Sequence, residues 1–474
     1  MAICLSTLGI CAQQLNFERT YGLPGYNYGK RVLQTKDGGY LILGNKSGFT
    51  GSSDIYLIKT DTLGVLMLDK AIGNASIEVA EDIKPTFDNG YIIAGYCNYG
   101  TNNDYQILLI KIDSLYNVEW LKNYGGTNWD FGYSVVQCPD SGFMVSGETF
   151  SYGNGNNDVF ILKTDADGTK LWHKAYGGQN EDVAKSISPY KNGFVISGYT
   201  NSFGNGQYDC YILNIEQSGD TLWTKTYGDS LDDKAYCVKQ VHDTAIVFCG
   251  YTENYGAQRK DALIVKIDST GNEKWKYLYG DLENDIFIDF VNDINNDLVF
   301  FGNTNSFGSS NDYYLLKTTT NCTFLLSKTY GDLNSEDGSS IYCTADSGYV
   351  VCGSTESYGI GISNIYVIKM NNSGISTGNV INETSVKENN FYSSNLIVYP
   401  NPSDGKIILK NYTKQDHLGY SLNIYDTKGK LVFSSYELGP FSNLVFDLSF
   451  LKMGFYIIEL YSANIVYRKK LSIY

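Results

Sequence analysis

Six acidic residues recur along the chain at nearly even intervals, each a few residues after a Tyr–Gly phrase or a degenerate copy of it. They are Asp82, Asp130, Asp182, Asp233, Asp285 and Asp337. Gathered at one mouth of the fold, these carboxylates would suit a cation, a basic peptide or the hydroxyl groups of a glycan. The alternative is structural, because an Asp in a turn accepts hydrogen bonds from nearby backbone N–H groups.

An aromatic–glycine pair recurs with the same period. Its aromatic members are Tyr99, Tyr152, Phe203, Tyr255, Phe307 and Tyr358. Together with the acids they could form a ligand-binding acidic mouth edged by aromatic rings, since binding residues concentrate on loops held by a rigid scaffold. In the structural alternative each ring fills the gap between two repeats. A residue present in every repeat usually serves what every repeat needs.

Two stretches carry oxygen ligands that suggest calcium, namely residues 154–158 (NGNND) and 165–168 (DADG). An EF-type loop needs a longer ligand set that ends in a bidentate acid, and neither stretch supplies one. The ten cysteines include no C-x-x-C pair, so a zinc site is not expected. Most cysteines fall in apolar strand patterns, which predicts buried free thiols, with a Cys237–Cys249 bridge as the alternative. We expect no cofactor and keep calcium as an alternative.

Catalytic signatures are absent from the sequence. The three histidines, His173, His242 and His417, lie in unrelated contexts, and there is no G-x-S-x-G, H-E-x-x-H or P-loop. The acids of adjacent pairs such as Glu181–Asp182 would point apart in a strand. We therefore expect no enzyme. A glycosidase with carboxylates from different repeats stays open as the alternative.

The elements that must position these residues come from a repeat. The glycine of the Tyr–Gly phrase, or of its degenerate copy, recurs in steps of 51 or 52 residues at Gly22, Gly73, Gly125, Gly177, Gly228, Gly280 and Gly331. A period near 50 is the signature of propeller blades. The third copy shows four short β-rich runs, at 133–137, 142–147, 158–163 and 170–176. The sequence predicts an all-β, seven-bladed β-propeller with four-stranded blades.

Turns and ends support this prediction. Asp/Asn/Ser–Gly turns such as residues 140–142 are expected to close hairpins because glycine accepts positive φ. The seventh repeat lacks its fourth strand, and residues 15–22 (LNFERTYG) supply that phrase at the start of the chain. We expect the N-terminal strand to complete the last blade, because an open ring would leave two unpaired edges.

The outermost strand carries a large apolar residue at one position in every repeat: Phe17, Leu68, Trp120, Trp172, Trp223, Trp275 and Leu326. Four of the five tryptophans lie here. A large side chain at one spot in every outer strand would pack one blade onto its neighbour. A ring of sugar-stacking tryptophans is the alternative.

Composition narrows the function class. The 474 residues carry a net charge of −15, which argues against nucleic acid or an anionic membrane as partner. No apolar run approaches the roughly 18 residues of a membrane span. Residues 1–12 are typical of the end of a secretory signal peptide, although the basic n-region is missing.

The last eighty residues lack the repeat and have a different sequence pattern. Residues 375–394 are polar and predict a linker, and alternating strands of a small β-sandwich follow. This part of the chain contains, in order, Tyr399, Pro400, Asn401, Pro402 and Gly405, then Tyr425, Asp426, Gly429 and Lys430, then Gly454 and Tyr456. With these residues at the usual spacings, residues 395–474 resemble the type A sorting domain of the type IX secretion system.

This resemblance implies a Bacteroidetes-type bacterium, export across the outer membrane by the secretion machinery, and removal of the domain by a sortase-like peptidase. The repeats also resemble D-G-G-Y…W-x-K-x-Y-G-G repeats of such exported proteins. We expect a propeller over 13–374, a sorting domain over 395–474, and a monomer secreted or displayed at the cell surface. Its predicted role is non-catalytic binding of a protein or glycan, with a polysaccharide-active enzyme as the alternative.

Overall fold

The computed structural model describes residues 16–47, 53–73, 76–99, 104–253, 259–384, 396–399, 403–411, 420–426, 430–438, 443–462 and 465–473. The chain divides into two compact units, Met1–Ser385 and Val386–Tyr474. Every regular element of the described residues is a β-strand, which confirms the all-β prediction. No helix in these ranges could cross a membrane.

Strands β2 to β25 form six four-stranded antiparallel sheets in chain order. Sheet 1 contains β2 (Tyr26–Gln34), β3 (Tyr40–Ser47), β4 (Ser53–Thr60) and β5 (Leu66–Ile72), and sheet 2 contains β6 (Glu78–Pro85), β7 (Tyr91–Cys97), β8 (Gln106–Ile112) and β9 (Val118–Tyr124). Sheet 3 contains β10 (Asp130–Gln137), β11 (Phe143–Thr149), β12 (Asp158–Thr164) and β13 (Lys170–Tyr176). Sheet 4 contains β14 (Asp182–Tyr190), β15 (Gly193–Thr200), β16 (Asp209–Glu216) and β17 (Thr221–Tyr227). Sheet 5 contains β18 (Asp233–Gln240), β19 (Ile246–Thr252), β20 (Asp261–Ile267) and β21 (Glu273–Tyr279), and sheet 6 contains β22 (Asp285–Asn292), β23 (Leu298–Thr304), β24 (Asp312–Thr318) and β25 (Phe324–Tyr330).

The closing sheet joins both ends of the repeat region. Its strand order is β26–β27–β28–β1–β29, with β26 (Glu336–Cys343), β27 (Tyr349–Thr355), β28 (Asn364–Met370), β1 (Phe17–Gly22) and β29 (Val380–Thr384). Strand β1 runs antiparallel to β28 with Phe17 opposite Lys369 and Tyr21 opposite Ile365. The predicted closure by the N-terminal strand is confirmed.

Strand β29 was not predicted. It runs parallel to β1 with Glu18 opposite Val380, so residues 380–384 form a fifth strand of the closing sheet. The linker prediction is therefore wrong for these residues, and the sheet region extends past residue 374. Without β29 the outer edge of β1 would be unpaired, and a short strand covers it.

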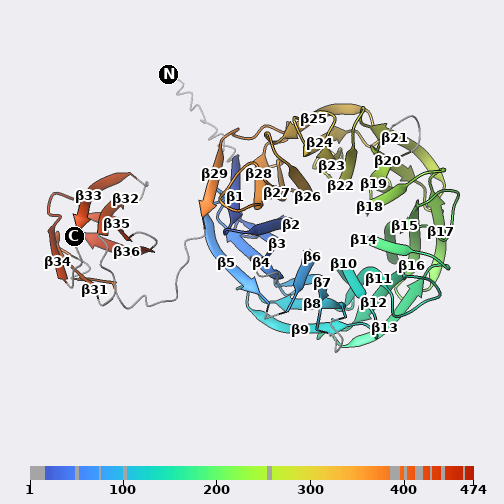
Figure 1. Ribbon diagram of the computed structural model, residues 1–474, viewed down its shortest axis with the longest axis horizontal. Coiled ribbons are helices and arrows are strands. Elements are labelled where there is room, and N and C mark those ends of the chain that lie inside the picture. Colours follow the sequence, from blue (N-terminus) through green and yellow to red (C-terminus); the bar gives the residue numbers. More distant parts are fainter. Residues whose placement is uncertain are drawn as a thin grey trace, which may run out of the picture. The chain divides into compact units, whose positions relative to one another are not determined.

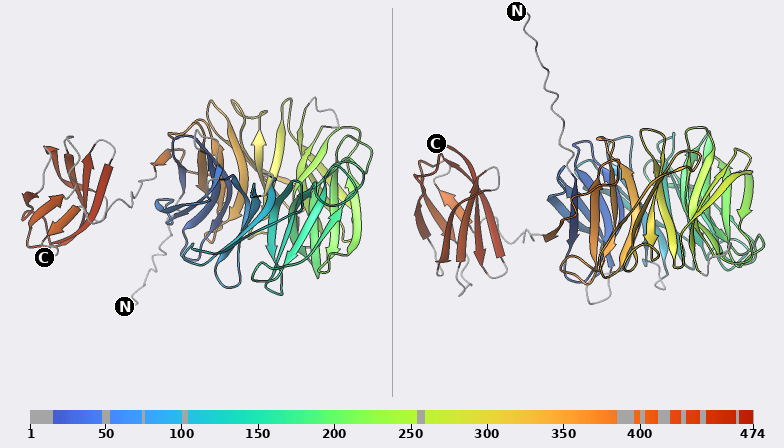
Figure 2. Two further views of the ribbon diagram at one scale, coloured as in Figure 1. Left: turned by 60° about the horizontal axis from the view of Figure 1, so that its bottom comes forward. Right: turned by 90° about the horizontal axis from the view of Figure 1, so that it is seen from above.

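The sheets stand around a ring, as in a propeller (Figure 1). The first strand of each sheet (β2, β6, β10, β14, β18, β22 and β26) lies nearest the ring axis, and the fourth strands form the outer wall. Side views show the strands standing next to one another around this wall (Figure 2). Neighbouring sheets share apolar cores; for example, Val32 and Tyr56 of sheet 1 pack with Val350 and Val367 of the closing sheet.

The outer phrase, by which we mean the apolar residue and the tyrosine that recur in the outermost strands, packs one sheet onto the next. Trp120 of β9 packs over Gly168, where an added Cβ would meet the indole ring, and Tyr124 donates a hydrogen bond to the Gly168 carbonyl at 2.5 Å. The same tyrosine–carbonyl bond recurs at Tyr21–Gly64, Tyr176–Gly219, Tyr227–Gly271 and Tyr330–Gly374. The phrase packs one sheet onto its neighbour, as the scaffold interpretation predicts.

The tight turns between first and second strands differ from the prediction in one detail. The residue with positive φ is the middle one, as at Ser141 (φ 67°) and Asn89 (φ 70°), and not the glycine after it. Gly142 is required for another reason, because a Cβ there would collide with the Thr164 carbonyl oxygen of the adjacent hairpin. Close backbone approach explains this glycine.

The second unit contains two sheets. One has the order β30 (Leu396–Tyr399), β31 (Lys406–Asn411), β34 (Asn443–Asp447), and the other has the order β33 (Leu431–Leu438), β32 (Tyr420–Asp426), β35 (Gly454–Ser462), β36 (Ile465–Ile473). Both contribute to one core, which includes Ile407 and Leu409 from the first sheet and Ile424 and Ile458 from the second. The unit therefore has a hydrophobic core of its own.

The fifth strand generates a stability prediction. A chain of residues 16–374 should be less stable than one of residues 16–384 by roughly 2–5 kcal/mol, because several ladder hydrogen bonds at about 1 kcal/mol each are lost and the Arg19–Glu383 ion pair disappears. Urea unfolding followed by tryptophan fluorescence measures the difference. Equal midpoints and slopes for the two chains would show that β29 adds nothing.

Candidate functional site

An acid occupies the first position of the inner strand in six of the seven sheets, and this register corrects two predictions. Asp130 lies opposite Thr149, and Asp182, Asp233 and Asp285 take the same place. In sheet 2 and the closing sheet the equivalent residues are Glu78, opposite Cys97, and Glu336, opposite Thr355. Asp82 and Asp337 were assigned to the series wrongly, because they lie at other positions of their strands.

These acids are buried and serve the turns of their own sheets. Asp130 is fully buried and accepts hydrogen bonds from the backbone N–H of Gly126 (2.8 Å), from Ser151 (2.7 Å) and from Thr149. Asp182 repeats the pattern with the N–H of Gly178. The predicted open acidic mouth is therefore not what these residues form. They cap turns, which is the structural alternative.

A second acid, at the start of the third strand, lies next to five of the six acids in this register, Asp130 being the exception. The pairs meet at the glycine of the Tyr–Gly phrase, where an added Cβ would contact both carboxylates: Asp54–Glu78, Asp158–Asp182, Asp209–Asp233, Asp261–Asp285 and Asp312–Glu336. Burial and then the neighbouring Glu336 raise the pKa of Asp312 to about 6. At the ring closure the equivalent residues are both amides, Asn27 and Asn364. An amide resembles a protonated carboxyl group, and Asp312 is suited to hold a proton beside Glu336.

Asp82 belongs to a different feature, an ion network near the ring axis. Arg31 of β2 lies 3.1 Å from Asp82 of β6 and 3.1 Å from Asp289 of β22, and Lys239 of β18 lies 2.8 Å from Asp289. Burial alone would raise the pKa of Asp289, but the charges of Lys239 and Arg31 hold it at about 2. The network links four sheets through paired charges. Its carboxylates are all engaged in these pairs, so we assign it a structural role.

The recurring aromatic residues pack against the third strand of their own sheets. Tyr152 stacks on Phe160 with ring centroids 5.7 Å apart, and Phe307 lies 5.4 Å from Tyr314. Phe203 and Tyr358 repeat this contact, and Tyr99 packs on the sheet 2 core and donates a hydrogen bond to Glu78. Tyr255 lies outside the described residues. These rings are part of the scaffold.

The two stretches considered for calcium use their oxygen atoms locally. Asp165 accepts a hydrogen bond from the Thr169 N–H at 2.7 Å, and Asp158 accepts bonds from the N–H groups of Asn154 and Gly155. Within the described ranges, no group of three or more His, Cys, Asp or Glu is arranged to hold a metal ion.

Of the histidines, His173 is part of the scaffold, and His417 lies outside the described residues. The His173 ring lies 4.4 Å from the Tyr152 ring and 5.3 Å from that of Phe160, so it packs inside an aromatic stack. His242 is exposed on a turn. The cysteines in the described segments are unpaired and mostly buried, and Cys237 lies directly opposite Cys249 in this reduced state.

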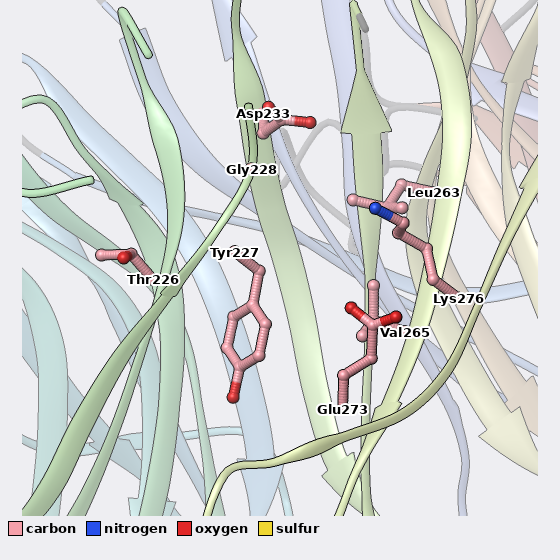
Figure 3. Close-up of a pocket in the computed structure, with 8 residues that line it drawn as sticks. All are labelled: Thr226, Tyr227, Gly228, Asp233, Leu263, Val265, Glu273 and Lys276. Atoms are coloured by element: carbon pink, nitrogen blue, oxygen red, sulfur yellow. The ribbon is translucent and has the colours of Figure 1, made fainter. Parts of the chain in front are cut away.

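A cavity of about 220 Å³ opens on the outer wall between sheets 4 and 5. Figure 3 shows Tyr227 and Asp233 on one side and Glu273 and Lys276 on the other. The Tyr227 hydroxyl donates to the Gly271 carbonyl, and Asp233 is one of the turn-capping acids. The cavity is thus a by-product of packing between repeats.

One cluster breaks the repeat, on the loop end of the ring where first strands begin. We define the aromatic patch as Tyr96, Tyr105, Trp129, Phe131 and Phe150. Trp129 is 49% exposed and Phe150 is 38% exposed, and their ring centroids lie 6.1 Å apart. The patch is continuous, because Tyr105 lies 5.9 Å from Trp129 and 5.4 Å from Phe131, and Tyr96 lies 4.9 Å from Phe131.

The backbone that carries the patch is the same in other sheets. The Phe150 N–H donates to the Trp129 carbonyl at 2.8 Å, and equivalent bonds join Asn201 to Glu181 and Asn305 to Asn284. At the place of Trp129 the other sheets have Tyr26, Ile77, Glu181, Asp232, Asn284 and Ser335. At the place of Phe150 they have Asn98, Asn201, Glu253, Asn305 and Glu356 in the described segments. The backbone is thus shared and the side chains differ: among the described residues, a Trp and a Phe stand together at these two places in sheet 3 alone.

A row of alternating tyrosines and lysines adjoins the patch. We define the lysine–tyrosine ladder as Tyr133, Lys185, Tyr199, Lys234 and Tyr208. The Lys185 Nζ lies 3.5 Å from the Tyr133 ring centroid, and the Lys234 Nζ lies 4.4 Å from that of Tyr199 and 3.8 Å from that of Tyr208. The Phe131 and Tyr133 rings stack at 6.3 Å and connect patch and ladder. Burial lowers the pKa of both lysines.

The sequence contained a signal for this site. Of the five tryptophans, Trp129 is the one that does not lie at the recurring position of the outermost strands. A search for residues that recur finds the scaffold, whereas residues that depart from the repeat on the loop end mark the patch. The ladder carried no such signal, because its members come from three sheets and meet only through the ring geometry.

The sorting-motif residues are partly described. Gly405 has φ of 105° in a turn, where the Leu448 N–H donates to its carbonyl. Tyr425 and Asp426 end β32, Lys430 donates its N–H to Asp426, and the Tyr456 hydroxyl donates to the Lys452 carbonyl. Gly454 begins β35 and Tyr399 ends β30. Pro400, Asn401, Pro402 and Gly429 lie outside the described residues.

Comparison with known proteins identifies the second unit. Residues 397–474 match the family of the secretion system C-terminal sorting domain. This domain directs type IX export to the cell surface or the extracellular space, so the chain is an exported, propeller-like repeat protein with a sorting tail. No curated protein matches the sequence significantly.

Two solved structures share a weak likeness. The crystal structure of a puromycin hydrolase has a TM-score of 0.46 at 9% identity, over 69% of this chain and 50% of the hydrolase. The β-propeller domain of the Trilobed protease from Pyrococcus furiosus has a TM-score of 0.43 at 11% identity, over 75% of this chain and 98% of that domain. This chain thus spans half the length of the hydrolase. Likenesses at this level say nothing about activity.

The acid pairs generate a pH prediction. The pKa of Asp312 is raised to about 6 in the folded chain and is about 4 in an unfolded one. Between these values the folded state holds the proton and the unfolded state loses it, so this residue makes stability fall as pH rises from about 4 to about 6. Asp312→Asn should remove that loss, and the melting temperature relative to the parent chain should rise from pH 4.5 to pH 7. Thermal melts across this range measure it, with exposed Asp167→Asn as control; a difference independent of pH would contradict the shared proton.

Proposed function

We propose that the chain is a secreted or surface-displayed seven-bladed β-propeller, followed by a β-sandwich sorting domain, that binds an extracellular glycan without catalysis. The seven sheets in ring order and the two-sheet second unit support this architecture. In this proposal a sortase-like peptidase removes the sorting domain after export, and the propeller acts as a monomer.

The aromatic patch carries the binding proposal. Trp129 and Phe150 expose large apolar surface at the loop end, where such surface marks an interaction site on a soluble protein. A sugar ring presents a face of C–H groups that packs on an aromatic ring, and its hydroxyl groups need polar partners nearby. Glu148, Asn157 and Lys185 lie on the adjoining strands of sheets 3 and 4. A rigid aromatic surface edged by polar groups fits a saccharide.

Binding without turnover is favoured by the state of the carboxylates. The recurring acids are buried in turn caps, and both oxygens of Glu148 accept hydrogen bonds, from Tyr133 and Asn157. A glycosidase needs two carboxyl groups facing the scissile bond across several ångströms. A polysaccharide-active enzyme remains the alternative that the binding assay separates.

Substitution of the patch tests the proposal on the full chain. Trp129→Ala and Phe150→Ala should each weaken retention by a bound polysaccharide about tenfold or more, because stacking area at the centre of a contact is lost. Affinity gel electrophoresis against a panel of neutral and acidic polysaccharides measures retention, and a reducing-sugar assay on the same panel measures cleavage. Phe324→Ala, at a 57% exposed outer-strand residue, is the matched control and should change nothing.

Three results would decide against the proposal. Retention that survives both patch substitutions would place binding elsewhere. Release of reducing ends by the parent chain would favour the enzyme. No retention by any polysaccharide, together with capture by a protein, would replace the glycan with a protein ligand.

A further inference from the structure

Lys185 differs from the other inner-strand lysines near it. Lys30 pairs with Glu81 at 2.9 Å, and Lys234 lies 4.0 Å from Asp232. Among the described residues no carboxylate forms an ion pair with Lys185, whose ammonium group instead lies between two tyrosine rings. In a chain with a net charge of −15 this is an unusual place for a cation without a counter-ion.

The carboxylates nearest to Lys185 are already engaged. Glu148 accepts hydrogen bonds from Tyr133 and Asn157, and Glu81 holds Lys30. A Tyr face attracts an ammonium group, but it does not supply the charge-assisted hydrogen bonds that a paired anion would supply. Burial lowers the pKa of Lys185, as expected for a cation that lacks a partner. The ammonium group thus has aromatic faces beside it and no paired anion among the described residues.

Lys185 also lies close enough to the aromatic patch for one ligand to contact both. Its ammonium is 3.5 Å from the Tyr133 ring centroid, and that ring stacks on Phe131 of the patch at 6.3 Å. The steps from Trp129 to Phe131 (6.5 Å) and from Phe131 to Tyr133 (6.3 Å) lead along β10 to this ammonium, so a saccharide chain of several residues stacked on the patch would reach it.

We propose that Lys185 is the subsite for a negatively charged substituent of the glycan, a uronate carboxylate or a sulfate ester, so that the bound polysaccharide is an acidic one. This inference rests on the proposed binding function and narrows it. The substituent would supply the missing counter-ion of Lys185, and the tyrosine rings on either side would hold the ammonium in position.

The test compares charged and neutral polymers of one backbone. The full chain should bind polygalacturonate or κ-carrageenan at least tenfold more tightly than methyl-esterified polygalacturonate or desulfated κ-carrageenan, respectively, and added salt should reduce this difference. The two charged polymers distinguish carboxylate from sulfate. Lys185→Met should abolish the preference, Lys185→Arg should keep most of it, and Lys170→Met, at an exposed outer-strand lysine, should keep all of it. Thermal melts confirm that each variant is folded.

The outcomes separate this inference from the proposed function. Equal binding of charged and neutral polymers that is still lost in Trp129→Ala would overturn the acidic subsite and leave glycan binding intact. A preference for charge that survives Lys185→Met would also overturn it. Retention by no polymer would overturn both, and tighter binding of polyglutamate than of any polysaccharide would assign the site to an acidic polypeptide.

Discussion

The structure depends on one strand that comes from the far end of the chain. All six residues of β1 are buried, and β1 fills the gap between β28 and β29. Its side chains bind in both directions: Tyr21 donates to the Gly64 carbonyl of sheet 1, and Glu18 accepts a hydrogen bond from Tyr366 of β28. Without β1 the closing sheet would have no outermost strand of the repeat, and the tyrosine–carbonyl bond found between most neighbouring sheets would be missing where the ring ends meet.

Ring closure also explains why the repeated residues are poor candidates for binding. Each sheet meets the next through a large apolar residue of the outer strand and a turn, and in most repeats through a tyrosine as well, so these positions are under a similar geometric demand in every repeat. The acids at the first strands belong to this set, since they hold the turns that bring neighbouring sheets together. The result is a rigid ring of sheets, and the loops at one end of the ring can carry different side chains at little cost to the stability of the fold.

Much of the fold could be predicted from the sequence, because the period near 50 and the offset phrase of residues 15–22 determine both the repeat and its closure. β29 could not, since VINET is short and polar and is a strand only because β1 offers an edge. The register errors at Asp82 and Asp337 arose because glutamate replaces aspartate at Glu78 and Glu336. The Arg31–Asp289 pair joins residues far apart in the chain, and no local pattern announces it.

The same contrast applies to the candidate site. Trp129 could have been found, because it departs from the tryptophan pattern, whereas Lys185 looks like any strand lysine until the ring places it between tyrosines of two sheets. Function in this molecule is thus expected where local chemistry departs from the repeat while the backbone follows it.

Native-state hydrogen exchange at the β1 amides tests closure most directly. The account predicts that the N–H groups of residues 17–21 exchange as slowly as those of β27 and β28, and at the same denaturant dependence, because they are released only when the ring opens as a whole. Exchange of the β1 amides orders of magnitude faster than that of β28 would show a strand that frays on its own, and would contradict a ring held shut by its first strand.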